Sequence, residues 1–277
     1  MKLWLGSENI DTHYIHALFT MLQHASVDVE YCPGKAGAIY LDGRPVAFVC
    51  YADFDQIPEH QAKFIRDNGI KTVLKYVYNS GTDYTGVGVP VIPFGYVAPG
   101  MFSMCPYGEF VPFAGRKYNL MARMRTHQGN KSRANREWSR ARRALVEQAG
   151  ALSGYAVLTD KVDLAQYLQE LALTQIGINW RGCSRLCFRL VEFLRFGVCM
   201  ISDDVGDCVF SGGTRLEAGT HYIKCSTTDE FTALFNSTIL DVKRMEEIGR
   251  AGYDFYLAHL SPQKMGQYLL ARIKENI

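Results

Sequence analysis

Carboxylates and a histidine follow the apolar segments in the N-terminal half of the chain. Asp11 and His13 come after the run KLWL, and Asp53 comes after the run PVAFVCYA. Because ligands of open α/β sheets bind beyond the carboxyl ends of the strands, each of these side chains could be a general base that removes the proton of a hydroxyl group. An Asp at such a place is also the usual N-cap of the next helix, so both roles stay open for Asp11 and Asp53.

The acidic residues and cysteines give only a weak metal signal. Asp53 and Asp55 form a D-x-D pair that could hold a divalent ion against a diphosphate. In a chain with fifteen Asp residues this spacing is unspecific. The eight cysteines contain no C-x-x-C pair, and several lie in apolar runs where Cys behaves as a small hydrophobic residue. We therefore expect no metal site and reduced cysteines.

A turn followed by an apolar helical pattern lies between residues 176 and 204. Gly182 and Ser184 provide the turn and a helix N-cap. The first turn of such a helix points free N–H groups and the positive end of its dipole at whatever lies above it. Arg181, Arg185 and Arg189 add positive charge near that end, so the segment suits a phosphate or diphosphate.

Glu192 lies on the same helical pattern, one turn beyond Arg189 and among apolar neighbours. It could form an ion pair with Arg189 or Arg195, which lie three residues away on either side. A carboxylate at this place could equally accept hydrogen bonds from the hydroxyl groups of a ribose. The residues alone do not decide between the two roles.

Positive charge is concentrated in one part of the chain. The net charge is +2, but residues 115–143 contain ten Lys and Arg against one acid, so this segment carries +9 and the remainder −7. A helical projection of residues 133–149 gives an apolar stripe led by Trp138 and a stripe of arginines on another face. A solvated face normally carries both positive and negative side chains. Two interpretations of the arginine stripe stay open: a face that binds a polyanion and a solvated face. The candidates for the binding face are Lys131, Arg133, Arg136, Arg140 and Arg143.

The elements that must position these residues are short strands that alternate with helices. Apolar runs of strand length, such as residues 2–5 and 45–52, alternate with helical patterns, and the rhythm repeats after the basic segment. This alternation is typical of the α/β class with mostly parallel sheets. Residues 97–115 are rich in Pro, Gly and aromatic residues and follow neither period. We place the connection there, which gives domains 1–115 and 116–277.

Hydropathy predicts a protein without a membrane span. No apolar run approaches the about 20 residues that a helix needs to cross a bilayer. The start MKLWLGSEN has too few apolar residues for the hydrophobic region of a signal peptide. Together with the cysteine pattern, these features predict a cytoplasmic protein.

A series of features follows in a fixed order in the C-terminal half: a small-residue turn, an R…E helix, a Gly, an apolar strand, and later a loop, a strand and a D-E helix. The residues in this order are Gly182, Ser184, Arg185, Arg189, Glu192, Gly197, Asp203, Gly219–Tyr222, Asp229 and Glu230, followed by RMEEIGRAGYDFYLAHLS. This order resembles the nucleotide-sugar-binding domain of GT-B glycosyltransferases, and among these the exostosin-like and group 1 transferases. The resemblance covers about residues 165–262, and at 277 residues the chain would be a compact member of viral or phage type.

The resemblance implies two Rossmann-like domains that face a cleft, with a nucleoside diphosphate sugar bound to the C-terminal domain and the acceptor bound to the N-terminal one. A UDP-sugar is a more typical donor than a GDP-sugar. Arg189 would contact phosphate and Glu192 would contact ribose. The implied donor contacts are Arg123, Arg125, Gly182, Ser184, Arg185, Arg189 and Glu192.

The resemblance also bears on the mechanism of transfer. Position 200 is Met, where many retaining members have a second Glu, and this favours an inverting reaction with one base. The candidates for that base are Asp53, Asp11 and His13. Arginines and helix N–H groups can stabilise a departing diphosphate without a divalent metal, as GT-B members generally do, so we expect no cofactor.

The surplus of arginines favours an acceptor that is itself anionic. One hypothesis is that the acceptor is double-stranded DNA with a hydroxymethylated base, and the alternative acceptor is a glycan. A non-catalytic α/β protein that binds nucleic acid through residues 115–143 is a competing class, although the sequence contains no named nucleic-acid-binding module. A third hypothesis is a metal-dependent GT-A transferase built around Asp53 and Asp55.

Overall fold

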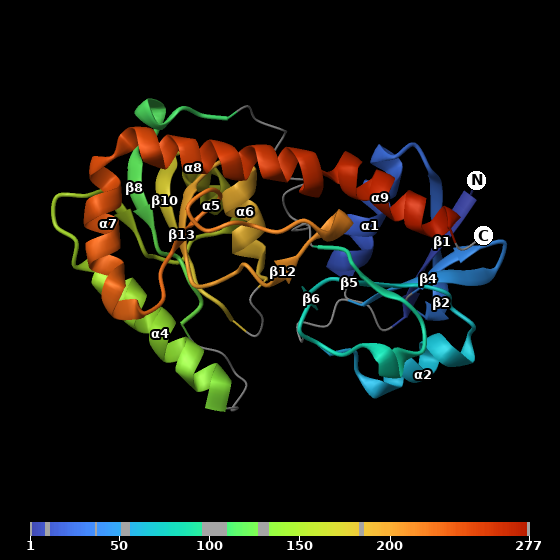
Figure 1. The fold of residues 1–277 in the computed structure, drawn as a ribbon. Coiled ribbons are helices and arrows are strands. Elements are labelled where there is room, and N and C mark those ends of the chain that lie inside the picture. Colours follow the sequence, from blue (N-terminus) through green and yellow to red (C-terminus); the bar gives the residue numbers. More distant parts are fainter. Residues whose placement is uncertain are drawn as a thin grey trace. The chain divides into compact units, whose positions relative to one another are not determined.

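The chain forms two compact units, each with its own β-sheet and helices (Figure 1). Unit 1 comprises Met1–Ser103, Asp207–Arg215 and Leu257–Ile277, and unit 2 comprises Met104–Gly206 and Leu216–Tyr256. The α/β class predicted from the sequence is confirmed. The computed structural model describes residues 2–8, 12–36, 38–50, 56–95, 110–126, 133–182 and 186–275.

The division into two units does not coincide with a single chain boundary near residue 115. Two later segments, Asp207–Arg215 and Leu257–Ile277, group with the N-terminal part, whereas the sequence assigns everything after residue 115 to a second domain. The physical reason is pairing between segments far apart in the chain. Strand β12 (Cys208–Val209) pairs antiparallel with β6 (Tyr78–Asn79) inside unit 1.

The last helix of the chain also belongs to unit 1. Helix α9 (Pro262–Lys274) packs along α1 (Thr12–His24). The two helices approach so closely that a Cβ atom at Gly266 would collide with the carbonyl oxygen of Met21. Glycine at this position therefore permits the contact that holds the C-terminal helix on unit 1.

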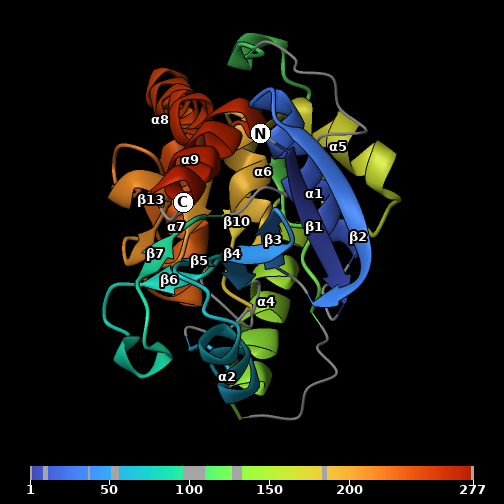
Figure 2. The same cartoon turned by 90° about the vertical axis from the view of Figure 1, so that its right-hand side faces the viewer.

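Unit 1 contains a six-stranded sheet in the order β2-β1-β3-β4-β5-β7. The pairings of β3 with β1 and β4 are antiparallel and the others are parallel. The β3–β4 hairpin turns at Asp42 and Gly43, whose φ angles of 49° and 78° are those that a two-residue D-G turn requires. Helix α1 lies beside β1 and β2 (Figure 2), and α2 (Glu59–Asp67) connects β4 to β5. The strands are β1 (Lys2–Glu8), β2 (Asp28–Ala36), β3 (Ala38–Leu41), β4 (Arg44–Cys50), β5 (Val73–Lys75) and β7 (Val91–Pro93).

Unit 2 contains a five-stranded sheet in the order β13-β11-β10-β8-β9, with parallel pairing throughout. From β8 the chain continues through α4 to β9 on one side, and from β10 it continues through α6 to β11 on the other side. The strand order therefore reverses between β8 and β10, which is where open α/β sheets bind ligands. The strands are β8 (Tyr118–Met121), β9 (Val157–Leu158), β10 (Thr174–Asn179), β11 (Cys199–Ser202) and β13 (Ile223–Lys224).

Helices cover both faces of the unit 2 sheet. Ile176 and Ile178 of β10 share a buried cluster with Leu145 of α4. Gly177 lies between them and faces the opposite side, where a Cβ atom would come within 2.5 Å of the ring of Phe193 in α6. The helices of unit 2 are α4 (Arg133–Gly150), α5 (Leu164–Ala172), α6 (Phe188–Phe196), α7 (Phe231–Leu240) and α8 (Val242–Phe255).

Helix α4 has the two faces that the sequence predicts. Leu145 and Ala149 are buried in the core of unit 2. Arg136, Arg140 and Arg143 are exposed, and we call these three residues the α4 arginines. The helix thus combines a packed apolar side with an exposed cationic side.

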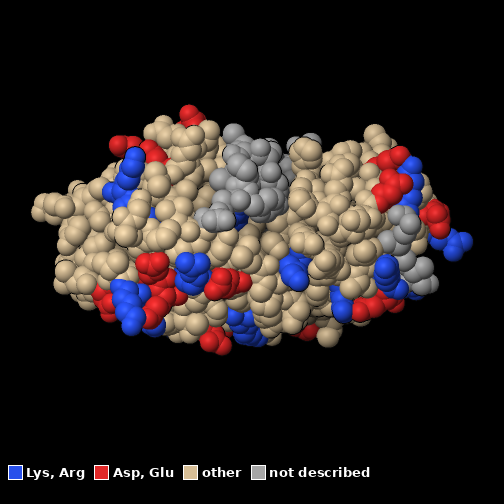
Figure 3. All heavy atoms as spheres, turned by 90° about the horizontal axis from the view of Figure 1, so that it is seen from above, with Lys and Arg blue, Asp and Glu red and all other residues tan. Residues whose placement is uncertain are grey.

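Other surfaces carry both signs of charge. On the face of the molecule drawn in Figure 3, Lys and Arg side chains lie interspersed with Asp and Glu side chains. In α8, Lys243 and Arg244 contact Glu247 at 4.0 and 3.3 Å. Exposed pairs of this kind stabilise the fold little. Within the described ranges, no helix has both the length and the hydropathy that a bilayer span requires.

Candidate functional site

The carboxyl ends of the unit 2 strands bring together several of the predicted donor contacts. Residues 122–126 follow β8, residues 159–163 follow β9, and residues 180–182 follow β10. The first and third of these loops flank the point where the strand order reverses. The described part of the candidate site consists of these loops and the helices α4, α5 and α6.

Arg142 of α4 ties the loops after β8 and β10 to each other. Its Nε and Nη2 donate to the carbonyl oxygen of Trp180 at 3.2 and 2.8 Å, and its Nη1 donates to the carbonyl oxygen of Arg125 at 3.2 Å. The residue is only 5% exposed, so these hydrogen bonds are largely shielded from competing water. Arg142 therefore fixes the backbone of both loops at the reversal point.

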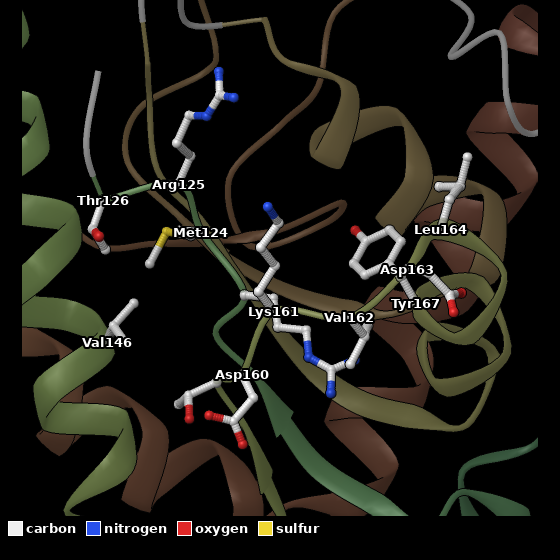
Figure 4. A pocket seen from close by; sticks show the side chains of 12 residues that line it. Met124, Arg125, Thr126, Val146, Asp160, Lys161, Val162, Asp163, Leu164 and Tyr167 are labelled. Atoms are coloured by element: carbon white, nitrogen blue, oxygen red, sulfur yellow. The ribbon is translucent and has the colours of Figure 1, made fainter. Parts of the chain in front are cut away.

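A pocket of about 680 Å³ lies beside these loops, within unit 2. It is bounded by the loops after β8 and β9 and by α4 and α5 (Figure 4). Arg125 and Lys161 extend in the same direction from the two loops, whereas the carboxylate of Asp160 points the other way (Figure 4). The apolar part of the lining consists of Met124, Val146, Val162 and Leu164.

Arg123 lines the same pocket but is held in an ion pair. Its Nη1 contacts Oε2 of Glu170, and the two side chains are only 10% and 14% exposed. The other oxygen of Glu170 accepts a hydrogen bond from Gln166 at 3.0 Å. Arg123 is therefore a fixed part of the pocket wall, whereas Arg125 is exposed.

The pocket is connected to α6 through Tyr167. The hydroxyl of Tyr167 donates to Oε2 of Glu192 at 2.7 Å. Burial, together with the neighbouring Glu192 carboxylate, raises the pKa of Tyr167 well above its usual value. Burial also raises the pKa of Glu192, although the Tyr167 hydroxyl and the nearby Arg189 act in the opposite direction. The hydroxyl thus stays a donor, and the hydrogen bond fixes the Tyr167 ring in the pocket wall.

Helix α6 starts later than the sequence predicts. Its N-cap is Cys187, not Ser184, and the Sγ of Cys187 donates to Oδ1 of Asn179 at 3.0 Å instead of capping the helix. Arg189 lies in the first turn, and its Nη1 is buried with no hydrogen-bond partner among the described residues. Because an unpartnered buried guanidinium nitrogen is costly, an anionic ligand at this place would satisfy it.

The two aspartates after β11 hold the neighbouring loops. Asp203 accepts a hydrogen bond from the backbone N–H of Arg181 at 3.1 Å and forms an ion pair with its guanidinium. Asp204 accepts hydrogen bonds from Lys224 at 2.6 Å and Tyr222 at 3.2 Å, and the Lys224 contact lowers the pKa of Asp204. These carboxylates stabilise the carboxyl edge of the sheet.

Apart from the exposed α4 arginines, the sequence-based candidates fall into three groups. Arg123 and Arg125 line the pocket, Gly182 follows β10, and Arg189 and Glu192 lie on α6. Asp11, Asp53, Lys131, Ser184 and Arg185 lie outside the described residues. His13 lies in α1 and Arg133 in α4, but the structure does not describe their side chains. The assignment of a base and of the remaining donor contacts therefore stays a prediction.

Lys161, Tyr167 and Arg142 are part of the site and were not predicted. Lys161 follows the apolar run YAVLT and could have been found by inspecting the end of that strand as well. Arg142 lies four residues after Trp138, on the apolar stripe of the helix, which is an unusual place for a solvated cation.

Within the described ranges, no group of three or more His, Cys, Asp and Glu residues could hold a metal ion.

The sequence matches no protein-family model and no curated protein. The structure is similar to that of a glycosyltransferase from Rickettsia africae ESF-5, with a TM-score of 0.52 and 12% identity over 97% of this chain and 83% of that one. The chain shares its fold with a glycosyltransferase.

Two further solved structures are less similar. Anabaena Alr3699/HepE in complex with UDP gives a TM-score of 0.49 at 9% identity over 98% of this chain and 99% of that one. The GtfA/B complex gives a TM-score of 0.44 at 14% identity over 83% of this chain and 52% of that one.

Proposed function

We propose that this protein is a glycosyltransferase that moves a hexosyl or pentosyl group from a nucleoside diphosphate sugar to an acceptor hydroxyl. The shared fold supports the reaction class. The observation that carries the proposal is the arrangement at the reversal point of the unit 2 sheet. There, Arg142 ties two loops, Arg125 is exposed, and the buried Nη1 of Arg189 has no partner among the described residues. Such a cationic edge suits the diphosphate of a donor.

In this proposal unit 2 binds the donor and unit 1 binds the reacting end of the acceptor. The diphosphate contacts Arg125, Gly182 and Arg189, and Ser184 and Arg185 remain donor contacts predicted from the sequence. Glu192 accepts a hydrogen bond from a ribose hydroxyl with the carboxylate oxygen that Tyr167 does not occupy. A UDP-sugar is the first donor to test and a GDP-sugar the second.

The transfer proposed here is a single displacement with inversion at the anomeric carbon. The acceptor oxygen forms a bond to that carbon while the bond to the diphosphate oxygen breaks, and the nucleoside diphosphate leaves with the electron pair. A base from the N-terminal half takes the hydroxyl proton, and Asp53, Asp11 and His13 are the candidates. The arginines stabilise the charge on the leaving group, so the proposal needs no divalent metal.

The α4 arginines support an anionic acceptor, and we propose double-stranded DNA with a hydroxymethylated base. These three side chains are exposed on one helix, where they could contact successive phosphates. Contacts of this kind make binding fall steeply as salt increases. If duplex binding is absent or insensitive to salt, a glycan is the better acceptor.

The reaction class is tested by incubating the full chain with a panel of UDP- and GDP-sugars and measuring release of the nucleoside diphosphate. The proposal predicts slow release from one donor, and faster release when the acceptor is present. A chain that releases no nucleotide and binds none, yet binds DNA, would contradict the proposal and favour a non-catalytic nucleic-acid-binding protein. Loss of activity with EDTA would contradict the metal-independent mechanism.

A further inference from the structure

The pocket of unit 2 extends beyond the donor contacts proposed so far. Arg125, Gly182 and Arg189 lie around the reversal point between β8 and β10. The pocket lies on the other side of the β8 loop, where the loop after β9 contributes Lys161 and Val162. Neither residue has a role in the diphosphate contacts described above.

The size and lining of the pocket suit a molecule with an apolar planar part and an anionic end. Its volume of about 680 Å³ lies inside the range that is usual for small-molecule sites. Met124, Val146 and Val162 provide apolar surface, and Arg125 and Lys161 extend from neighbouring loops in one direction (Figure 4). A nucleoside phosphate has both parts.

The anionic end must be recognised by side chains and not by the helix that starts at the pocket. Asp163 is the N-cap of α5, and its Oδ1 accepts a hydrogen bond of 2.8 Å from the backbone N–H of Gln166. A carboxylate therefore already occupies this helix end. Arg123 is engaged by Glu170. Lys161 and Arg125 are therefore the cations that can approach a phosphate in the pocket.

Tyr167 gives the pocket a wall with a fixed orientation. Its hydroxyl is held by Glu192, so the ring cannot turn away without breaking a hydrogen bond in a desolvated environment. A preorganised aromatic ring beside apolar side chains lowers the cost of ordering a bound base.

The backbone gives a bound nucleotide its direction. Arg125 belongs to the pocket, and Arg142 ties its carbonyl group to that of Trp180 in the loop after β10. A phosphate at Arg125 therefore stands between the pocket on the β9 side and the turn at Gly182 on the β10 side.

Resting on the proposed glycosyltransferase function, we infer that this pocket binds the nucleoside end of the donor and that Lys161 contacts the phosphate nearest the ribose. The base lies against Met124, Val146 and Val162, and the chain of phosphates runs past Arg125 toward the reversal point. The loop after β9 then selects the nucleotide, while the loop after β10 binds the part of the donor that reacts.

Calorimetric titration of the full chain with uridine, UMP and UDP tests this assignment, with the guanosine series in parallel. In Lys161→Met the side chain keeps its length and loses its charge, so UMP and UDP should bind about tenfold more weakly while the affinity for uridine is unchanged. Lys117→Met is the matched control, because Lys117 is exposed at the amino end of β8, and it should change none of the affinities. In Val146→Trp the indole fills the pocket, and all ligands of the series should bind more weakly.

The outcomes separate this inference from the function on which it rests. If the wild-type chain binds UDP or GDP and Lys161→Met and Val146→Trp bind it equally well, the pocket assignment is wrong and the proposed function stands. If the wild-type chain binds no nucleotide of either series, both are wrong. A thermal unfolding curve of Val146→Trp shows whether weaker binding is due to a misfolded variant. If Val146→Trp is misfolded, Lys161→Met alone tests the pocket assignment, because Lys161 is exposed and its substitution leaves the core intact.

Discussion

Two buried arginines of unit 2 provide a matched test of the donor site. Arg142 and Arg116 are 5% and 6% exposed, and each donates three hydrogen bonds to backbone carbonyl groups. Arg142 joins loops at the carboxyl ends of β8 and β10. Arg116 contacts Val111, Thr174 and Phe196 near the amino ends of the same sheet. The two residues thus have similar chemistry at opposite edges.

Arg142→Met should lower the free energy of unfolding by about 2–3 kcal/mol. The substitution leaves the buried carbonyl of Trp180 without its two hydrogen bonds, at a cost of about 1–3 kcal/mol, and water can only partly replace the bond to the carbonyl of Arg125. The methionine retains most of the apolar contact of the arginine stem. Arg116→Met should lose at least as much, because it deprives three carbonyl groups of their donor.

Nucleotide binding should separate the two variants. Without Arg142 the loop that carries Arg125 must be ordered when the ligand binds, and an ordering cost near 1.4 kcal/mol weakens UDP binding about tenfold. Arg116→Met should keep the wild-type affinity at a temperature where both variants are folded. Urea unfolding followed by tryptophan fluorescence measures the stabilities, and isothermal titration with UDP, or with GDP if only that binds, measures the affinities. Equal affinities for the two variants would refute the idea that Arg142 organises a donor site.

Three further predictions follow from particular contacts. Because burial raises the pKa of Glu192 in the folded state, its contribution to stability is full below the unfolded value of about 4.5 and is lost as pH rises through the folded value. Glu192→Gln should therefore gain stability relative to wild type between pH 4 and 8, as measured by urea midpoints; a constant difference would contradict the burial of this carboxyl group. Gly177→Ala should cost about 1–3 kcal/mol, because the methyl group overlaps the Phe193 ring, and an unchanged melting temperature would contradict this packing. Replacing the α4 arginines by Ser should reduce the slope of log affinity for duplex DNA against log salt by about 3, and an unchanged slope would exclude them from phosphate contact.

The sequence predicts local structure well where one face of an element is apolar. The apolar stripe of α4 follows directly from residue spacing, and Leu145 and Ala149 are buried as expected. The grouping of Asp207–Arg215 and Leu257–Ile277 with unit 1 could not be predicted in this way. It depends on pairing between distant segments, such as β12 with β6, which local periodicity does not encode.

Burial and pairing of side chains limit what the charge pattern of the sequence predicts about the candidate site. Counting residues 115–143 treats every arginine as a free cation, yet Arg116 and Arg142 are buried donors to the backbone and Arg123 is paired with Glu170. Burial also lowers the pKa of Arg116 to about 10. The cationic character of the segment is therefore smaller than its composition indicates. Among its basic side chains that the structure describes, Lys117, Arg125 and the α4 arginines are the exposed ones.

Amide hydrogen exchange of the full chain with and without the nucleoside diphosphate tests the central claim most directly. If unit 2 binds the donor at the carboxyl edge of its sheet, the ligand should slow exchange in the loops at residues 122–126, 159–163 and 180–182 and in the first turns of α5 and α6. The amino edge, including residues 113–117, should be unaffected. Protection confined to other segments, or none at all with UDP and GDP at saturating concentrations, would contradict the assignment of the donor site.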